Sequence, residues 1–207
     1  MQGQQTVRVL AAFSACALAG CNLFPPLVRG IDALEGKVAD GRYTSPDGTL
    51  SLRVPQTDSY ELRWMQAKEI AKPDEFYVSF GPAAFDQSIY RCGVTRLGTG
   101  LGTDVDLRDA CHRIVEQTGL QLEPMTHTAL ETVDERADTI QGQAAYGMHL
   151  RQHAPAGTVS NRDTSILHEA WLVRYGDRLT FTWVQTYEGQ PTKGIGAQEF
   201  TRSVELR

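Results

Sequence analysis

Cysteine and histidine offer the strongest nucleophiles and metal ligands in this chain, and their spacing limits which metal sites they could form. The cysteines are Cys16, Cys21, Cys92 and Cys111. The histidines are His112, His127, His149, His153 and His168. The sequence contains no Cys-x-x-Cys and no His-Glu-x-x-His spacing, which are common zinc-binding patterns. His149 and His153 would share a strand face about 13 Å apart, too far for one metal ion. We therefore expect solvated strand histidines and neither a metal nor another cofactor.

Motifs for enzymatic chemistry are also missing from the sequence. No Gly-x-Ser-x-Gly nucleophile elbow occurs. The glycine-rich segment 98–103 could bring backbone amides close to a phosphate, but no lysine follows in the Walker position. Thr103 also replaces the third glycine of a dinucleotide-binding fingerprint. We predict a protein that is not an enzyme, with a hydrolase as the enzymatic alternative.

The N-terminal stretch is organised around Cys21. Arg8 precedes an unbroken run of apolar and small residues that ends at Gly20. The run is shorter than the roughly 20 residues of a membrane-spanning helix and fits the roughly 7–15 residues of a signal-peptide core. Leu18-Ala19-Gly20-Cys21 resembles the bacterial lipobox, in which the cysteine sulfur receives a diacylglycerol and the chain is cut before it. The alternatives are an ordinary secretory signal peptide and a buried N-terminal helix.

The lipobox interpretation predicts the organisation of the chain and its compartment. Residues 1–20 would be the signal peptide, residues 21–40 the lipidated cysteine and a tether, and residues 41–207 a single domain. Asn22 follows the cysteine, where an aspartate retains enteric lipoproteins in the inner membrane. We therefore expect a lipid anchor at the periplasmic face of the outer membrane, with the inner membrane as the alternative.

The charge balance restricts the partners. The chain has a formal net charge of −5, and loss of residues 1–20 would remove one positive charge, Arg8. An acidic surface argues against nucleic acid, whose binding depends on neutralised phosphates, and against a polybasic membrane patch. Beyond the membrane contact through the lipid, we expect an envelope protein as partner. The alternative is a small molecule or lipid carried in a pocket between sheet and helix.

Strand signals dominate the rest of the chain. Ser45-Pro46-Asp47-Gly48 is a turn signal, and the alternation that follows it predicts an opening hairpin over residues 43–54. Gly176-Asp177 is the expected two-residue loop of a second hairpin, with Leu172 opposite Phe181. Further strands are expected at 76–80, 88–97, 125–131 and 140–150, and a strand or helix at 60–70. A short helix is expected at 197–206, with a last strand over 200–206 as the alternative.

One amphipathic helix is expected after residue 103, with Thr103 or Asp104 as its N-cap and Gly119 as its stop. Its apolar stripe consists of Leu107, Cys111, Ile114 and Val115. Cys111 would face the core from this helix and Cys92 from the preceding strand. We therefore predict a Cys92–Cys111 disulfide in an oxidising compartment, with two buried free thiols as the alternative.

Few helices and many consecutive strands predict an α+β fold with an antiparallel sheet. Residues 43–55 resemble the opening hairpin of Mog1/PsbP-like domains, including bacterial lipoproteins of the DcrB type. The later helix, the hairpin between Trp171 and Trp183, and the closing segment 200–204 are similar in order. The resemblance implies an α/β/α sandwich around an antiparallel sheet and a role in binding or assembly, without catalytic residues to transfer.

Overall fold

A computed structural model provides the structure of the chain. It describes the residues 36–57, 64–69, 76–82, 88–97, 105–126, 128–157, 161–189 and 194–207. Within them, no helix is long and apolar enough to cross a membrane. Cys21 and the glycine-rich segment 98–103 lie outside the described residues, so the expectations attached to them stay predictions.

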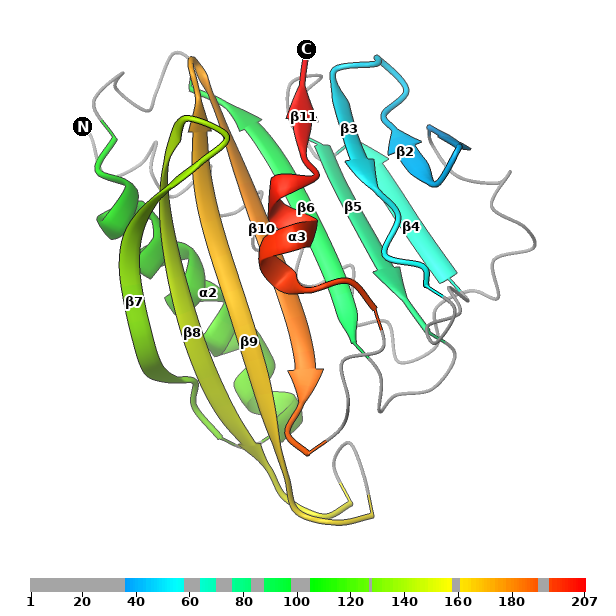
Figure 1. The fold of residues 1–207 in the computed structure, drawn as a ribbon. Coiled ribbons are helices and arrows are strands. Elements are labelled where there is room, and N and C mark those ends of the chain that lie inside the picture. The colour runs from blue at the N-terminus through cyan, green and yellow to red at the C-terminus, as the bar shows by residue number, and fades with distance from the viewer. Residues whose placement is uncertain are drawn as a thin grey trace.

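A seven-stranded antiparallel sheet forms the centre of the molecule, in the order β4-β5-β6-β10-β9-β8-β7 (Figure 1). Four strands that follow one another in sequence, β7 to β10, make up one half of it. Consecutive antiparallel strands need only short connections, which is why the run of strand signals folds as a meander. The strands are β4 Trp64–Glu69, β5 Phe76–Gly81, β6 Ile89–Arg96, β7 Glu131–Ile140, β8 Gln143–Ala154, β9 Thr164–Tyr175 and β10 Arg178–Tyr187.

The helix α2 (Leu107–Thr126) covers one face of this sheet (Figure 1). Its apolar stripe packs on side chains that point to that face from β8, β9 and β10, as expected from the 3.6-residue period. The buried cluster contains Leu97, Cys111, Ile114, Val115, Tyr146, Met148, Leu150, Ala170, Leu172, Leu179, Phe181 and Trp183.

Both ends of α2 differ from the sequence expectation. Asp106 Oδ1 accepts the backbone N–H groups of Arg108 and Asp109 at 2.8 and 3.2 Å, so Asp106 is the N-cap. Gly119 does not stop the helix. A Cβ at Gly119 would lie 3.3 Å from Leu130 Cδ1, so the glycine lets the chain after the helix approach closely. The helix continues to Thr126 and replaces the start of the predicted strand 125–131.

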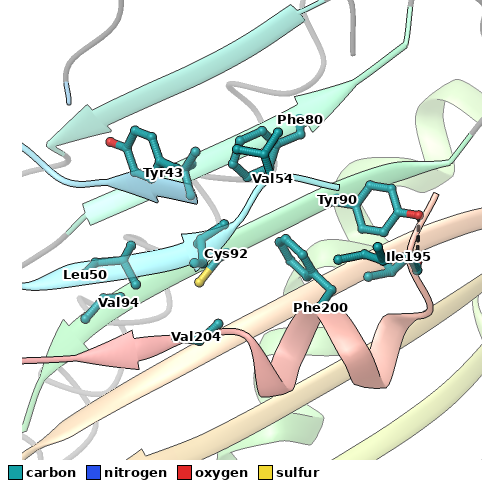
Figure 2. Packing of buried hydrophobic residues seen from close by; sticks show 13 residues of the cluster. Tyr43, Leu50, Val54, Phe80, Tyr90, Cys92, Val94, Ile195, Phe200 and Val204 are labelled. Carbon is teal, nitrogen blue, oxygen red and sulfur yellow. Dashed lines mark hydrogen bonds between the residues drawn. The ribbon is translucent and has the colours of Figure 1, made fainter. Parts of the chain in front are cut away.

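The opposite face carries a four-stranded sheet and the helix α3 (Ala197–Arg202) (Figure 1). Both pack on β5, β6 and β10 through thirteen buried residues, among them Phe80, Tyr90, Cys92 and Phe200 (Figure 2). The order β1-β2-β3-β11 places the last strand of the chain beside β3. The strands are β1 Lys37–Ala39, β2 Arg42–Thr44, β3 Leu50–Arg53 and β11 Glu205–Leu206.

The predicted α+β fold with an antiparallel sheet is confirmed, with helices on both faces; α3 shares its layer with a small sheet. The expected opening hairpin forms, and Tyr43 lies opposite Leu52 in it. In the second hairpin Leu172 lies opposite Phe181, as expected. The segment 197–206 forms both the helix and the strand that were alternatives. The strand β1 lies inside the predicted tether, because Val38 pairs with Tyr43.

Candidate functional site

An open groove of about 470 Å³ lies on the face of the large sheet that also carries α3. Strands β8, β9 and β10 form its floor, and the start of α3 borders it. Val133 lies at an irregularity in the β7–β8 pairing, and its side chain is 58% exposed. The lining residues are Val133, His149, Leu150, Arg151, Leu167, His168, Glu169, Val184, Thr186, Gly196 and Ala197.

Strand alternation decides which of these residues present side chains to the groove. His149 pairs with Glu169, and Arg151 pairs with Leu167, so these four residues share the groove face. Leu150 belongs to the cluster under α2 and contributes backbone here. His149 and Arg151 therefore lie on the face opposite Tyr146 and Leu150.

The charged groups of the groove already have partners. Glu169 Oε1 accepts the indole N–H of Trp171 at 2.7 Å and lies 3.7 Å from His149 Nε2. Arg151 Nη2 lies 3.5 Å from Glu188 Oε1. These pairs flank the side chains of Val133, Leu167 and Val184. The groove thus combines apolar surface with a border of paired charges, an arrangement that suits a segment of another molecule rather than a lone ion.

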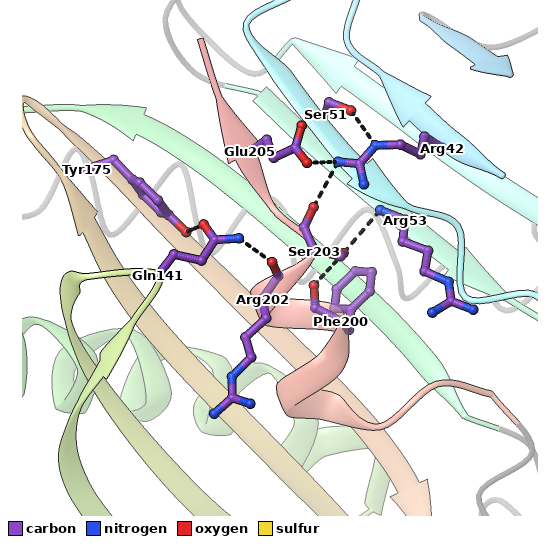
Figure 3. Close-up of polar contacts among 9 residues, drawn as sticks. All are labelled: Arg42, Ser51, Arg53, Gln141, Tyr175, Phe200, Arg202, Ser203 and Glu205. Atoms are coloured by element: carbon purple, nitrogen blue, oxygen red, sulfur yellow. Dashed lines mark hydrogen bonds and ion pairs between the residues drawn. The ribbon is translucent and has the colours of Figure 1, made fainter. Parts of the chain in front are cut away.

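Polar contacts from both sheets hold the helix α3, which borders the groove, and the segment that leads from it into β11 (Figure 3). Arg42 Nη2 donates to the Ser203 carbonyl at 3.0 Å and lies 3.0 Å from Glu205 Oε1. On the other side, the Gln141 side chain donates to the Arg202 carbonyl and accepts a hydrogen bond from Tyr175 at 3.2 Å. Both sheets therefore hold α3, and the helix is a fixed border of the groove.

The groove carries few groups for bond-making chemistry. Among its described lining residues, Thr186 has the one hydroxyl, and no cysteine is present. Within the described part of the chain, no group of three or more His, Cys, Asp or Glu residues gathers where it could hold a metal ion. This arrangement of residues can bind another molecule through apolar contact and hydrogen bonds.

The predicted Cys92–Cys111 disulfide is wrong. Both cysteines are buried free thiols. Cys92 packs with Tyr90 and Phe200 on the α3 face of the sheet, whereas Cys111 packs under α2 on the other face. The sheet lies between them, so neither side chain can reach the other. Burial raises the pKa of each thiol to about 12, which keeps both protonated and unreactive.

His168 also departs from the sequence expectation of a solvated histidine. Its side chain is 2% exposed and lies on the α2 face, where Trp183 Nε1 donates to its Nδ1 at 3.1 Å. His112, at the α2 surface, pairs with Glu135. Sequence reasoning missed the groove itself, because β7 is exposed on both faces and its sequence carries no alternating signal.

No sequence-family model and no curated protein sequence matches this chain. Solved structures with a similar fold include the cyanobacterial PsbP from Synechocystis, with 14% identity and a TM-score of 0.44, covering 80% of this chain and 87% of that one. Another is the Saccharomyces cerevisiae Ran-binding protein Mog1p, with 13% identity and a TM-score of 0.46, covering 82% and 96%. At these identities the likeness concerns the fold and assigns no function.

Proposed function

We propose that this chain is a lipid-anchored binding or assembly domain of the cell envelope, acting without catalysis, and that the groove beside α3 holds a protein partner. The observation that supports this proposal most strongly is the groove itself, with the exposed Val133 at its edge. An exposed valine in a strand rich in charged and polar residues is a contact that a partner would bury. The paired charges around it match the polar rim of protein interfaces.

A carrier function finds less support. The alternative expectation places a small molecule or lipid in a pocket between sheet and helix. In the described residues, the layer between α2 and the sheet is filled by a continuous apolar cluster that includes Trp183, Phe181 and Met148. Because interiors pack densely, a ligand there would have to displace these side chains. The surface groove needs no such rearrangement.

A pair of photo-crosslinking positions tests the groove. A crosslinking amino acid at Thr186, inside the groove, should give a discrete adduct in envelope fractions of the native host. The same amino acid at Thr139, an exposed position on β7 outside the groove, is the matched control. V133D should weaken the Thr186 adduct at least about tenfold, because it places a charge in the apolar contact. Equal adducts from both positions, or an adduct that V133D leaves unchanged, would refute the groove proposal.

The lipid anchor has a separate test. The intact mass of the protein extracted from membranes should correspond to a chain that starts at Cys21 and carries acyl groups. The variant C21S should accumulate with its N-terminal residues retained and without acyl groups. A mature chain without acyl groups would overturn the anchor and leave the groove proposal standing, since the groove experiment does not depend on it.

A further inference from the structure

The groove beside α3 is open on the side of β7. Helix α3 borders the groove next to β10, whereas β7 is the end strand of the large sheet, with no further strand beyond it in the described residues. A partner that approaches from this side passes over β7 first. The groove floor follows two rows of directly paired residues that cross the sheet from β7 to β10. The first row is Asp134, His149, Glu169 and Val184, and the second is Glu131, Arg151, Leu167 and Thr186.

Strand β7 presents an apolar side chain between two carboxylates on the groove face. Val133 is 58% exposed and lines the groove. Asp134 is directly paired with His149, and Glu131 with Arg151, so both acids share the face of these groove residues. Both acids are exposed, and within the described residues neither side chain makes a hydrogen bond or an ion pair. Their charges are therefore available to another molecule.

Negative charge is in excess around the groove. Glu169 and Glu188 add to the two carboxylates of β7, whereas Arg151 is the one arginine or lysine among the described lining residues. Arg136, the next cation along β7, lies 4.0 Å from Asp138 and is balanced by it. Charges that are complementary across an interface speed association and select partners, so this border favours a cation.

The excess of carboxylates also argues against other occupants. A second copy that presents the same face would bring like charges together, and an anionic lipid surface would be repelled in the same way. An inorganic cation would leave the apolar side chains of Val133, Leu167 and Val184 uncovered. A protein segment can supply an apolar contact and a positive charge at once.

We propose that the groove binds a basic protein segment, in which a lysine or arginine lies within about three residues of an apolar side chain. The apolar side chain contacts Val133 and Leu167. The basic side chain pairs with Glu131 or Asp134. Glu131 and Leu167 stand in one row with β8 between them, so they are roughly 10 Å apart, which an extended chain covers in about three residues. The site is the groove of the proposed function, on which this partner chemistry rests.

A peptide titration of the full-length chain tests the charge and the apolar contact separately. The basic probe is the nonapeptide Lys-Thr-Leu-Thr-Lys-Thr-Leu-Thr-Lys, acetylated and amidated at its ends. One control peptide replaces every lysine by glutamate, and the other replaces every leucine by serine. The backbone amide signals of Val133 and Asp134 in ¹⁵N-labelled protein report binding.

The basic probe should shift both signals saturably, with a Kd at or below about 1 mM. Its binding should be weaker at about 500 mM than at about 50 mM salt, because exposed charges are screened. Each control peptide should bind at least about fivefold more weakly, since one lacks the cations and the other the apolar side chains. No saturable shift by the basic probe, or an equal response to the acidic peptide, would overturn the proposal.

Charge variants of the chain test the same point with the native partner. E131Q/D134N removes both carboxylates of β7 and should weaken the crosslinked adduct from Thr186 about fivefold, the effect of losing two exposed ion pairs. D109N/E116Q removes two exposed carboxylates of α2, on the other side of the sheet, and should leave the adduct unchanged.

The two sets of variants distinguish this proposal from the groove proposal. If V133D weakens the Thr186 adduct and E131Q/D134N leaves it unchanged, the partner is not a basic segment, and the proposed function stands. If both pairs of charge variants weaken the adduct equally, the effect is one of net charge, and the partner chemistry is again refuted. If Thr186 gives no adduct at all, the groove proposal and the partner chemistry both fail.

Discussion

Burial sets the chemistry of the most reactive side chains of this protein. Cys92 and Cys111 are enclosed on opposite faces of one sheet, which leaves them protonated and apart. His168 is held neutral by its surroundings and is fixed by the indole of Trp183. Each of these residue types could act as a nucleophile, a ligand or a base at the surface. Inside the two packed layers, the cysteines act as small apolar side chains, and His168 accepts a hydrogen bond from the Trp183 indole.

His168 should make the stability of the protein depend on pH. Its folded-state pKa of about 3 lies below the ordinary value of 6.5, so the unfolded chain takes up the proton first as the pH falls. The stabilisation is complete above pH 6.5 and is lost progressively toward pH 3, by roughly 1 kcal/mol for each pH unit. H168Q keeps an acceptor for Trp183 but does not titrate, so its unfolding free energy should fall less steeply over this range.

Urea unfolding at several pH values between 7 and 4 measures this difference. The same change at His153, an exposed histidine on β8, is the control for removing one histidine. If the unfolding free energies of wild type and H168Q fall equally with pH, His168 is not the cause of the pH dependence.

Gly147 allows the Trp171 ring to lie flat on β8. A Cβ at Gly147 would lie 2.6 Å from two carbons of that ring, and Trp171 is 1% exposed, so the ring has little room to move. We expect G147A to lower the free energy of unfolding by about 1–3 kcal/mol through overpacking. G196A is the matched control, because a Cβ there meets nothing within 4 Å. Equal stability of the two variants in thermal or urea unfolding would contradict the packing argument.

The helix α3 is the element that joins the two sheets, although it spans only Ala197–Arg202. A helix of this length has almost no stability of its own, so its tertiary contacts must hold it. Phe200 packs between Phe80 and Tyr90, with ring centroids 6.2 and 5.2 Å away. The Tyr90 hydroxyl donates to the Ile195 carbonyl at 2.8 Å and fixes the chain that enters the helix (Figure 2).

Truncation of the central side chain of α3 should therefore be costly. F200A should lower the free energy of unfolding by about 3–5 kcal/mol. Phe200 is fully buried, and the cavity left by its truncation would be enclosed by the two sheets. R202A, which shortens an exposed side chain of the same helix, should change stability by less than about 0.5 kcal/mol. Chemical denaturation of both variants measures the contrast, and similar losses would mean that α3 is not anchored through Phe200.

At the scale of the whole molecule, the last strand of the chain pairs with a strand from the beginning of the described domain. The strand β11 pairs with β3, with Glu205 opposite Ser51 and Leu206 opposite Leu50. The four-stranded sheet is therefore complete only after the last residues of the chain have folded back. This long-range pairing raises contact order, which is expected to make folding slower than in helical proteins of similar size.

C-terminal truncation should separate the contributions of the two outer layers. A chain that ends at Gly189 lacks α3 and β11 and exposes the cluster around Tyr90 and Phe80. We expect it to lose cooperative urea unfolding and to bind a hydrophobic dye. A chain that ends at Val204 keeps α3 and loses the β11 pairing together with the Arg42–Glu205 ion pair, so it should still unfold cooperatively at a lower urea concentration. Cooperative, dye-free behaviour of the shorter chain would contradict the dependence of the core on α3.

Local sequence patterns alone determined the elements in which short-range geometry is decisive. The Gly176-Asp177 turn sets the register of the β9–β10 hairpin, and the spacing of Leu107, Cys111 and Ile114 sets the buried face of α2. Alternation along residues 88–97 also brings Tyr90, Cys92 and Val94 to one face. Periodicity, however, says which residues share a face and not what covers that face. Only the tertiary structure decided that Cys92 and Cys111 lie on opposite sides of the sheet, that His168 is buried, and that β11 returns to β3, because each depends on pairings between segments distant in sequence.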